Sequence, residues 1–243
     1  MKTKIIFLFS VLSIISYSQP YKEIENIERL NRISKVIETG FFGNQKDWKS
    51  EYTLQNGKII NKETFYKEKK RANFEYIYDS NGNFLQMNVT DLNNGVKSVL
   101  YDLNYVYNSE NLLIEDKFTL YEYYENQKLK SKTHKEYDEN LKIAWKYEYE
   151  YNDKGLVSKE TKTTFIDRQK QIEIESYLYD DYGNVVELNR ESNPEMEYPL
   201  IVIGARSKYK KENFEYEYQN DIWIKKHLVL ERKKYLLSER EIM

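Results

Sequence analysis

Histidine is the side chain most often used for acid–base chemistry near neutral pH, and this sequence contains two, His134 and His227. Both lie in stretches with the alternation of a β-strand, so isolated surface or half-buried side chains are expected rather than a catalytic pair. The sequence has no Gly-x-Ser-x-Gly elbow, no His-Glu-x-x-His motif and no glycine-rich phosphate loop. No catalytic residue and no cofactor is therefore predicted.

Carboxylates leave one kind of catalysis open, because the chain has 40 Asp and Glu residues. A glycoside hydrolase is recognised by two carboxyl groups about 5 to 10 Å apart in space, which spacing in sequence does not reveal. A glycan hydrolase with such a pair is therefore kept as an alternative to a binding function.

The segment that follows Tyr78 has some features of a calcium-binding loop. Asp79, Asn81 and Asn83 place oxygen atoms at alternate positions, as the start of a calcium loop does. An EF-hand loop puts glycine at position 6 and a bidentate glutamate at position 12, whereas Gly82 here is at position 4 and Thr90 at position 12. No metal site is predicted.

Aromatic side chains supply most of the apolar content: 24 Tyr, 10 Phe and 3 Trp in a chain whose mean hydropathy is −0.84. In "IAWKYEYEY" they alternate with Ala, Lys and Glu, so one face of a strand would carry a ladder of rings. Flat rings beside charged groups can stack on sugars and bond their hydroxyls. The candidate ligand-binding residues are Trp145, Tyr147, Tyr149, Tyr151 and Trp223. The competing interpretation is that these rings form the core of the sheet.

A repeated motif, first seen as "YIYDSNGN" at 76–83, has Asp or Asn followed three residues later by Gly or once by Asn. That is the spacing of a type I turn closed by a residue in the left-handed region, as in a hairpin with a G1 bulge. We interpret the motif as a structural hinge. Its residues are Tyr76, Tyr78, Asp79, Gly82, Tyr105, Tyr107, Tyr177, Tyr179, Asp180 and Gly183.

The hinges recur every 13 to 16 residues, which fits a strand of about 10 residues and a turn of about 4. Turns this short join only antiparallel neighbours. The predicted fold is mostly β: a long up-and-down antiparallel meander over 41–243. Residues 190–206 interrupt the period with Pro194, Pro199 and the aliphatic run 200–203. This segment is interpreted as a loop that plugs one end of the sheet, with a ligand-contacting insertion as the alternative.

The N-terminal region differs from the rest of the chain. Residues 1–18 have the charged, apolar and small-residue order of a secretory signal peptide, and their apolar run is shorter than the roughly 20 residues that span a bilayer. Residues 19–40 have apolar side chains at three- and four-residue spacing and are predicted to form an amphipathic helix packed on the sheet. No transmembrane segment is expected after signal cleavage.

Cysteine is absent, which excludes disulfides, thiolate metal sites and a lipidated N-terminal cysteine. The signal peptide predicts that the protein is exported, whether periplasmic, cell-surface-associated or secreted, and the absence of cysteine predicts that it is not a lipoprotein. Removing Lys2 and Lys4 from the 38 basic residues leaves a mature charge of −4 against 40 acidic ones. This balance argues against a nucleic-acid partner.

The tandem Tyr-x-Tyr-Asp-x-x-Gly-Asn units resemble the YD repeats of rearrangement-hotspot (Rhs) and related bacterial surface proteins. The resemblance covers roughly 70–241, and near the C-terminus Gln219 replaces Asp and the glycine is missing. Large members of that family are similar to spiral β-shells that enclose a toxin, and others are described as carbohydrate-binding. The five or six repeats of this chain are too few to enclose a cargo domain. We expect an exported, non-enzymatic binding or scaffold protein with a glycan or envelope protein as partner; an inhibitor or immunity-type module is the other alternative.

Overall fold

The computed structural model describes residues 32–42, 45–92, 95–99, 105–135, 143–166, 169–202 and 206–243. These residues form seventeen strands in one sheet and no helix. The strands are β1 (Lys35–Phe42), β2 (Gln45–Gln55), β3 (Lys58–Tyr66), β4 (Lys69–Tyr78), β5 (Phe84–Asp91), β6 (Lys97–Val99), β7 (Val106–Tyr107), β8 (Leu113–Glu115), β9 (Thr119–Tyr123), β10 (Leu129–His134), β11 (Ile143–Tyr151), β12 (Val157–Ile166), β13 (Gln169–Tyr179), β14 (Val185–Asn193), β15 (Lys211–Gln219), β16 (Ile222–Leu230) and β17 (Lys233–Ile242).

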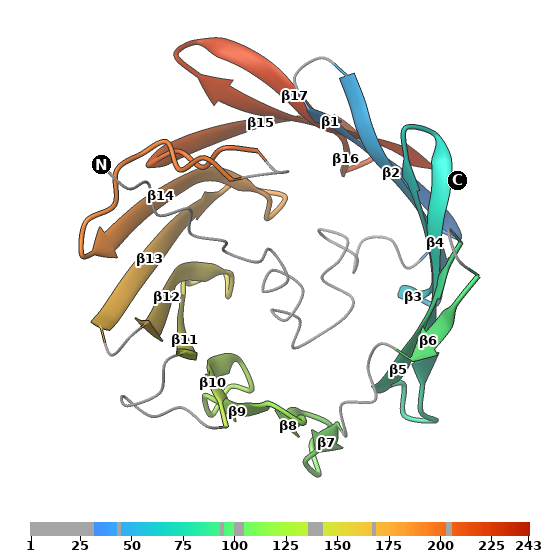
Figure 1. Ribbon diagram of the computed structural model, residues 1–243, viewed down its shortest axis with the longest axis horizontal. Coiled ribbons are helices and arrows are strands. Elements are labelled where there is room, and N and C mark those ends of the chain that lie inside the picture. The colour runs from blue at the N-terminus through green and yellow to red at the C-terminus, as the bar shows by residue number, and fades with distance from the viewer. Residues whose placement is uncertain are drawn as a thin grey trace.

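Every pairing between these strands is antiparallel and joins neighbours in the chain, with one exception. β1 to β6 pair in sequence order, and so do β7 to β17. The exception is β17, which also pairs with β1 through Val36↔Ile242 and Gly40↔Ser238. Figure 1 shows the result: the strands follow one another around a ring. The prediction of an up-and-down antiparallel meander is confirmed, and the meander curls until its first and last strands meet.

The two faces of the sheet differ in burial because side chains alternate along each strand. One face carries the buried rings Tyr52, Tyr76, Tyr149 and Trp223, and we call this concave side of the ring the inner face. The opposite side is the outer face, and it carries residues such as Glu148 and Glu150. The main apolar cluster lies on the inner face of β1 to β5 and consists of Val36, Tyr52, Leu54, Ile59, Tyr76, Phe84, Met87 and Val89.

The hinge turns have the chemistry expected of a type I turn with a left-handed closing residue. The N–H of Gly82 donates to the carbonyl of Asp79 at 3.0 Å, and Gly82 has φ of +82°. The Asp79 carboxylate accepts a hydrogen bond from the N–H of Asn83 at 2.7 Å. This and further hydrogen bonds to the carboxylate hold its pKa below the ordinary value, although desolvation acts in the opposite direction. Asp180 and Gly183 repeat the arrangement, with φ of +79° at Gly183. Only glycine adopts this φ without steric cost, so the motif specifies the turn.

The second tyrosine of the motif has a role that turn chemistry does not show. Its hydroxyl donates to a backbone carbonyl at the beginning of an earlier strand, just after a turn. Among the described residues, five such tyrosine–carbonyl bonds are 2.6 to 2.8 Å long: Tyr78 to Ile59, Tyr107 to Phe84, Tyr123 to Leu113, Tyr151 to Leu129 and Tyr179 to Val157. In the last repeat the first tyrosine, Tyr216, makes the corresponding bond to Val185 at 2.9 Å, whereas Tyr218 donates to Asp180. Each bond therefore ties one hairpin to the previous one.

The predicted N-terminal helix lies mostly outside the described residues, and the start of the sheet needs a correction. Residues 1–31, with the signal peptide and most of the helix predicted for 19–40, lie outside the described residues. Where the prediction overlaps the described chain, residues 35–40 belong to strand β1. The β-branched Val36, Ile37 and Thr39 favour a strand, and pairing with both β2 and β17 outweighs the helical spacing of the apolar residues. The sheet thus begins at Lys35 rather than at residue 41.

The segment 190–206 begins in β14, which ends at Asn193, and its described residues beyond that point lie outside the named strands. Of the aliphatic run predicted to plug the sheet, Ile201 is 85% exposed, so its side chain fills nothing. Leu200 pairs with Lys208 in an isolated antiparallel bridge, and we call the described residues on its two sides, 200–202 and 206–209, the strap. The strap residues used below are Arg206, Lys208 and Tyr209.

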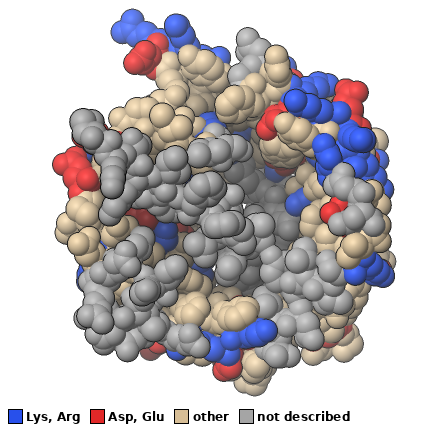
Figure 2. All heavy atoms as spheres, in the orientation of Figure 1, with Lys and Arg blue, Asp and Glu red and all other residues tan. Residues whose placement is uncertain are grey.

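Charge is unevenly distributed around the ring. Figure 2 shows that Lys and Arg gather along the rim over β2 to β4. Part of this charge is neutralised locally, since Glu51 lies 2.7 Å from both Lys35 and Lys49. Exposed pairs of this kind stabilise a fold by about 0 to 1 kcal/mol each, so the rim is a charged surface rather than a source of stability.

Candidate functional site

A small polar cavity of about 130 Å³ opens on the inner face of β11 to β13. Its walls combine one aromatic ring, three carboxylates and two ammonium groups. The lining residues are Tyr147, Glu160, Lys162, Glu173, Glu175 and Lys208. Lys208 comes from the strap, so the cavity lies between the sheet and this loop.

Register explains why these side chains meet. Tyr147 on β11 is paired with Lys162 on β12, which is paired with Glu173 on β13. One row along, Tyr149 is paired with Glu160, and Glu160 with Glu175. Neighbouring strands lie about 4.8 Å apart, so each row brings its three side chains into contact range. The tight β12–β13 hairpin fixes this register.

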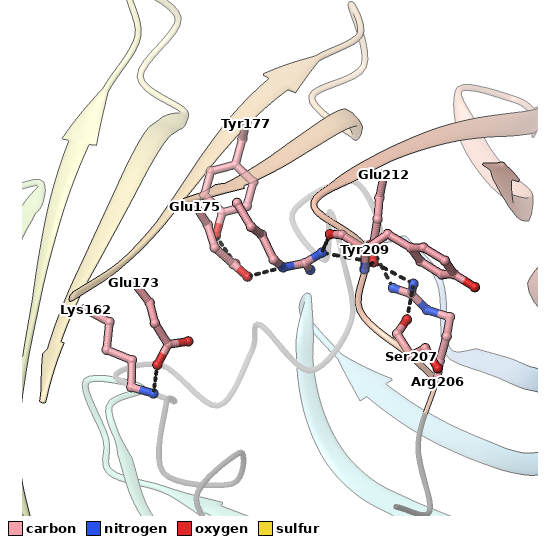
Figure 3. A network of polar contacts seen from close by, with 9 residues as sticks. Lys162, Glu173, Glu175, Tyr177, Arg206, Ser207, Tyr209 and Glu212 are labelled. Atoms are coloured by element: carbon pink, nitrogen blue, oxygen red, sulfur yellow. Dashed lines mark hydrogen bonds and ion pairs between the residues drawn. The ribbon is translucent and has the colours of Figure 1, made fainter. Parts of the chain in front are cut away.

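Two of the three carboxylates have basic partners. Glu173 accepts from the Lys162 ammonium at 3.0 Å. Glu175 accepts from the Arg190 guanidinium at 2.8 Å and from the Tyr177 hydroxyl at 2.7 Å. Figure 3 shows both groups side by side on β12 to β14, and their side chains extend toward the space inside the ring. These contacts fix the positions of Glu173 and Glu175 in the cavity wall.

Glu160 differs from its neighbours, because it makes no ion pair within the described residues. Burial raises the pKa of its carboxyl above the ordinary value, and the charge of the directly opposite Glu175 raises it further. Lys132 and the hydrogen bond with Tyr149 act in the other direction. The cavity therefore holds a carboxyl group that keeps its proton to higher pH beside two carboxylates held by basic partners.

We expect Glu160→Gln to stabilise the fold at alkaline pH. The native state holds the Glu160 proton at pH values where the unfolded chain, with a pKa of about 4.3, has lost it. Stability contributed by this group is thus fully present below the unfolded pKa and falls as pH rises through the raised native pKa. In urea denaturation between about pH 4 and pH 8, the free energy of unfolding of the variant should increase relative to that of the wild type as pH rises.

Glu148→Gln is the matched control for this experiment. Glu148 lies on the outer face of β11, 52% exposed and paired with Lys146 at 2.7 Å. Its replacement should change stability by well under 1 kcal/mol at every pH. If Glu160→Gln instead loses stability relative to the wild type as pH rises, the native state stabilises the Glu160 carboxylate. That outcome would contradict the raised pKa assigned to Glu160.

A second polar cluster stands behind the cavity and anchors the strap. Glu212 on β15 is fully buried and receives both guanidinium nitrogens of Arg206, at 2.8 and 2.9 Å. The N–H of Tyr209 donates to it at 3.0 Å (Figure 3). An Arg190 guanidinium nitrogen lies 2.9 Å from the same carboxylate. Burial alone would raise the pKa of Glu212, but these bonds and the charges of Arg206 and Arg190 hold it below the ordinary value. Arg190 thus bridges Glu175 in the cavity wall to Glu212 beneath the strap.

The predicted aromatic ligand site is largely enclosed. Trp145 and Tyr149 are 9% and 8% exposed, and Trp223 is 2% exposed, with the Arg240 guanidinium 3.5 Å from its ring centre. Trp145 packs edge-on against Tyr147 and His134. Trp145, Tyr149 and Trp223 thus have little ring surface exposed to solvent. Tyr147 and Tyr151 are half-buried, and of the five predicted residues Tyr147 lines the cavity.

The two histidines are not brought together. His134 lies on β10 beside the Trp145 ring, with centroids 5.7 Å apart. His227 lies on β16, and its Nε2 is 4.0 Å from Glu217. Among the described residues no group of three or more His, Asp or Glu is placed to hold a metal ion.

Sequence reasoning missed Glu160, Lys162, Glu173 and Glu175, although a signal for them was present. Each pair has i,i+2 spacing in a strand, which places its two members on one face. A two-residue hairpin connection at 167–168 would have set the strands in the observed register. Arg190 and Glu212 had no comparable signal, since their contact depends on the path of the strap.

Solved structures that resemble this chain do so with low sequence identity and low TM-scores. No family model matches the sequence, and no curated protein matches it. A porin-like protein from Bacteroides uniformis has 10% sequence identity over 87% of this chain and 98% of its own, with a TM-score of 0.45. Among other solved structures, TcdB2–TccC3 without its hypervariable C-terminal region has 14% identity over 80% of this chain (TM-score 0.33), and the Tc holotoxin pore of Photorhabdus luminescens has 11% over 82% (TM-score 0.30). This chain spans 10% and 14% of those two chains.

No helix in the described part of the chain has the length and apolar character needed to cross a bilayer.

Proposed function

We propose that this chain is an exported, non-enzymatic binding or scaffold protein of the cell envelope or the secreted fraction, related to small YD-repeat proteins. Its ligand surface would be the cavity at β11 to β13, and its ligand a glycan. The observation that carries the proposal is that the half-buried Tyr147 ring lines the same cavity as the Lys162–Glu173 ion pair.

The chemistry of the cavity supports a sugar better than other ligand classes. A tyrosine ring offers a flat face to the C–H side of a sugar, and charged oxygen and nitrogen groups form strong hydrogen bonds with hydroxyls. Three carboxylates facing two lysines give a mixed charge, which suits neither a polyanion nor an apolar ligand. The cavity is smaller than the roughly 300 Å³ of a complete ligand site, so it would hold one unit of a longer chain.

The inhibitor or immunity-type alternative needs an exposed sheet edge for strand addition. Within the described residues, β6 and β7 each have one paired neighbour, and both strands are short. All the longer strands are paired on both sides, so little of the described edge is open to a partner.

A specific observation also favours the hydrolase as a second candidate. Glu160, with a raised pKa, is paired across the sheet with Glu175, whose charge is held by Arg190. A protonated carboxyl facing an ionised one is the arrangement that glycosidases use for a general acid and its partner. The binding proposal comes first because Glu175 is already occupied by Arg190 and Tyr177.

One experiment tests both candidates. The protein is incubated with purified peptidoglycan sacculi; bound protein is measured by co-sedimentation and released reducing sugar by a colorimetric assay. We expect binding without sugar release, and roughly tenfold weaker binding for Tyr147→Ala, because a stacked ring contributes about 1 kcal/mol or more. Tyr235→Ala, at a 41% exposed ring on β17, is the control and should bind as wild type does.

Two outcomes would change this assignment. Absence of binding, or equal binding by Tyr147→Ala in a folded variant, would refute the proposed surface. Sugar release that disappears in Glu160→Gln would replace the binding function by the hydrolase.

A further inference from the structure

A second cavity lies on the outer face of the sheet, across β3 to β6, and is larger than the first. Its volume is about 280 Å³. The polar residues that line it are Asn61, Asn73, Glu75, Asn88, Thr90 and Lys97. Because Phe74, Tyr76, Met87 and Val89 point to the inner face, these alternate residues point outward, and the cavity is separate from the inner-face site.

Cross-strand register arranges these side chains in two rows. Asn61, Glu75 and Asn88 form one row across β3, β4 and β5. Asn73, Thr90 and Lys97 form the other across β4, β5 and β6. Neighbours within a row are about 4.8 Å apart, and the rows are about 7 Å apart along the strands. A ligand lying across the strands would therefore meet a polar side chain at every strand.

Much of this hydrogen-bonding capacity is unused within the protein. The Asn88 amide donates to Glu75 at 3.0 Å and accepts from the Gln86 amide. Asn61, Asn73 and Thr90 make no side-chain hydrogen bond with any described residue, and Lys97 makes no ion pair with one. Each free amide can offer two donors and one acceptor oxygen to a ligand.

Charge and polarity narrow the ligand class. The carboxylate of Glu75 and the ammonium of Lys97 balance, so the lining has no net charge to attract a polyanion or a polycation. An extended peptide would need free backbone N–H and C=O groups, but the backbones of these strands are paired with one another. Amides, a hydroxyl and one carboxylate are the groups that bond sugar hydroxyls as both donors and acceptors.

We propose that this outer-face cavity binds a neutral saccharide of two or three units, laid across β3 to β6. The site is independent of the inner-face cavity, and neither assignment requires the other. Outer-face recognition rests on amide and hydroxyl side chains, whereas the inner-face cavity uses a tyrosine ring and charged groups.

The test is isothermal titration of the whole protein with three neutral trisaccharides, namely maltotriose, cellotriose and triacetylchitotriose, and two charged probes, trigalacturonate and trilysine. At least one neutral trisaccharide should bind with a Kd in the micromolar to millimolar range. Asn73→Ala and Asn88→Leu should each weaken that binding up to about tenfold, as expected for the loss of one hydrogen-bonding group.

Controls separate this site from the inner face. Asn213→Leu, at a half-buried outer-face asparagine on β15, should bind as wild type does. Tyr147→Ala should leave trisaccharide binding at the outer face unchanged. The proposal is overturned if no neutral trisaccharide binds at about 10 mM, if a charged probe binds more tightly than all three, or if folded Asn73→Ala and Asn88→Leu variants bind unchanged.

Discussion

Replacing Glu212 with glutamine is expected to lower the free energy of unfolding by about 3 to 5 kcal/mol at neutral pH. The side chain is fully buried and accepts two hydrogen bonds from Arg206 and one from the N–H of Tyr209. Glutamine has nearly the same shape but no charge, and its amide hydrogens would face guanidinium donors. The variant would therefore leave the buried Arg190, 8% exposed, with Glu175 as its remaining carboxylate.

The pH dependence of this effect identifies its electrostatic origin. The pKa of Glu212 is lowered in the native protein, so its stabilisation is fully present above the unfolded pKa of about 4.3 and is lost as pH falls through the native pKa. The difference between wild type and Glu212→Gln, measured by urea denaturation, should therefore narrow in acid.

Glu217→Gln on the same strand is the control for Glu212. Glu217 is 52% exposed and lies 3.4 Å from Lys225, so its replacement should cost less than about 1 kcal/mol. If both variants lose the same small amount of unfolding free energy, the ion pairs of Glu212 only offset the cost of removing these charges from water. In that case the bridge between Leu200 and Lys208 would be the contact that fixes the strap.

Much of the sheet could be predicted from the sequence because its information is local. Alternation of tyrosine with charged residues gives the strands, and an Asp or Asn with glycine three residues later gives the turns. The hinge residues Tyr78, Tyr107 and Tyr179, which stand directly before predicted turns, are the last residues of β4, β7 and β13. Short connections then fix the order of neighbours.

Closure of the ring could not be predicted in the same way. The pairing of β1 with β17 joins residues such as Glu38 and Arg240, whose side chains meet at 3.2 Å from opposite ends of the described chain. No local pattern specifies this contact, and the helical spacing within 19–40 concealed the strand that makes it. The same limit applies to the site: the i,i+2 pairs on β12 and β13 are visible in sequence, but the strap that covers them is not.

Replacing three motif tyrosines with phenylalanine is expected to remove about 3 kcal/mol of stability without changing the fold. Tyr78, Tyr123 and Tyr179 lie on β4, β9 and β13, and each donates its hydroxyl to a backbone carbonyl on the adjacent strand, at 2.8, 2.8 and 2.6 Å. Each Tyr→Phe change keeps the ring and removes the donor, at a cost of about 1 kcal/mol. The three sites share no partner, so their effects should add.

The burial of these hydroxyls makes the expectation specific. Burial, with a smaller contribution from Tyr151, raises the pKa of Tyr179 to about 12, so the group remains a neutral donor throughout the ordinary pH range. Tyr235→Phe is the control, because that ring is 41% exposed and its loss of a hydroxyl should be neutral within about 0.5 kcal/mol.

The result decides what the repeated tyrosine is for. Additive losses measured by urea denaturation in the single, double and triple variants would show that the hydroxyl ties successive hairpins together, so that the motif sets the turn with its Asp and Gly and the link between repeats with its second tyrosine. Stability unchanged in the triple variant would mean that the ring alone is required. The hydroxyls would then be satisfied by water at no cost, and the motif would specify only packing on the inner face and the turn that follows it.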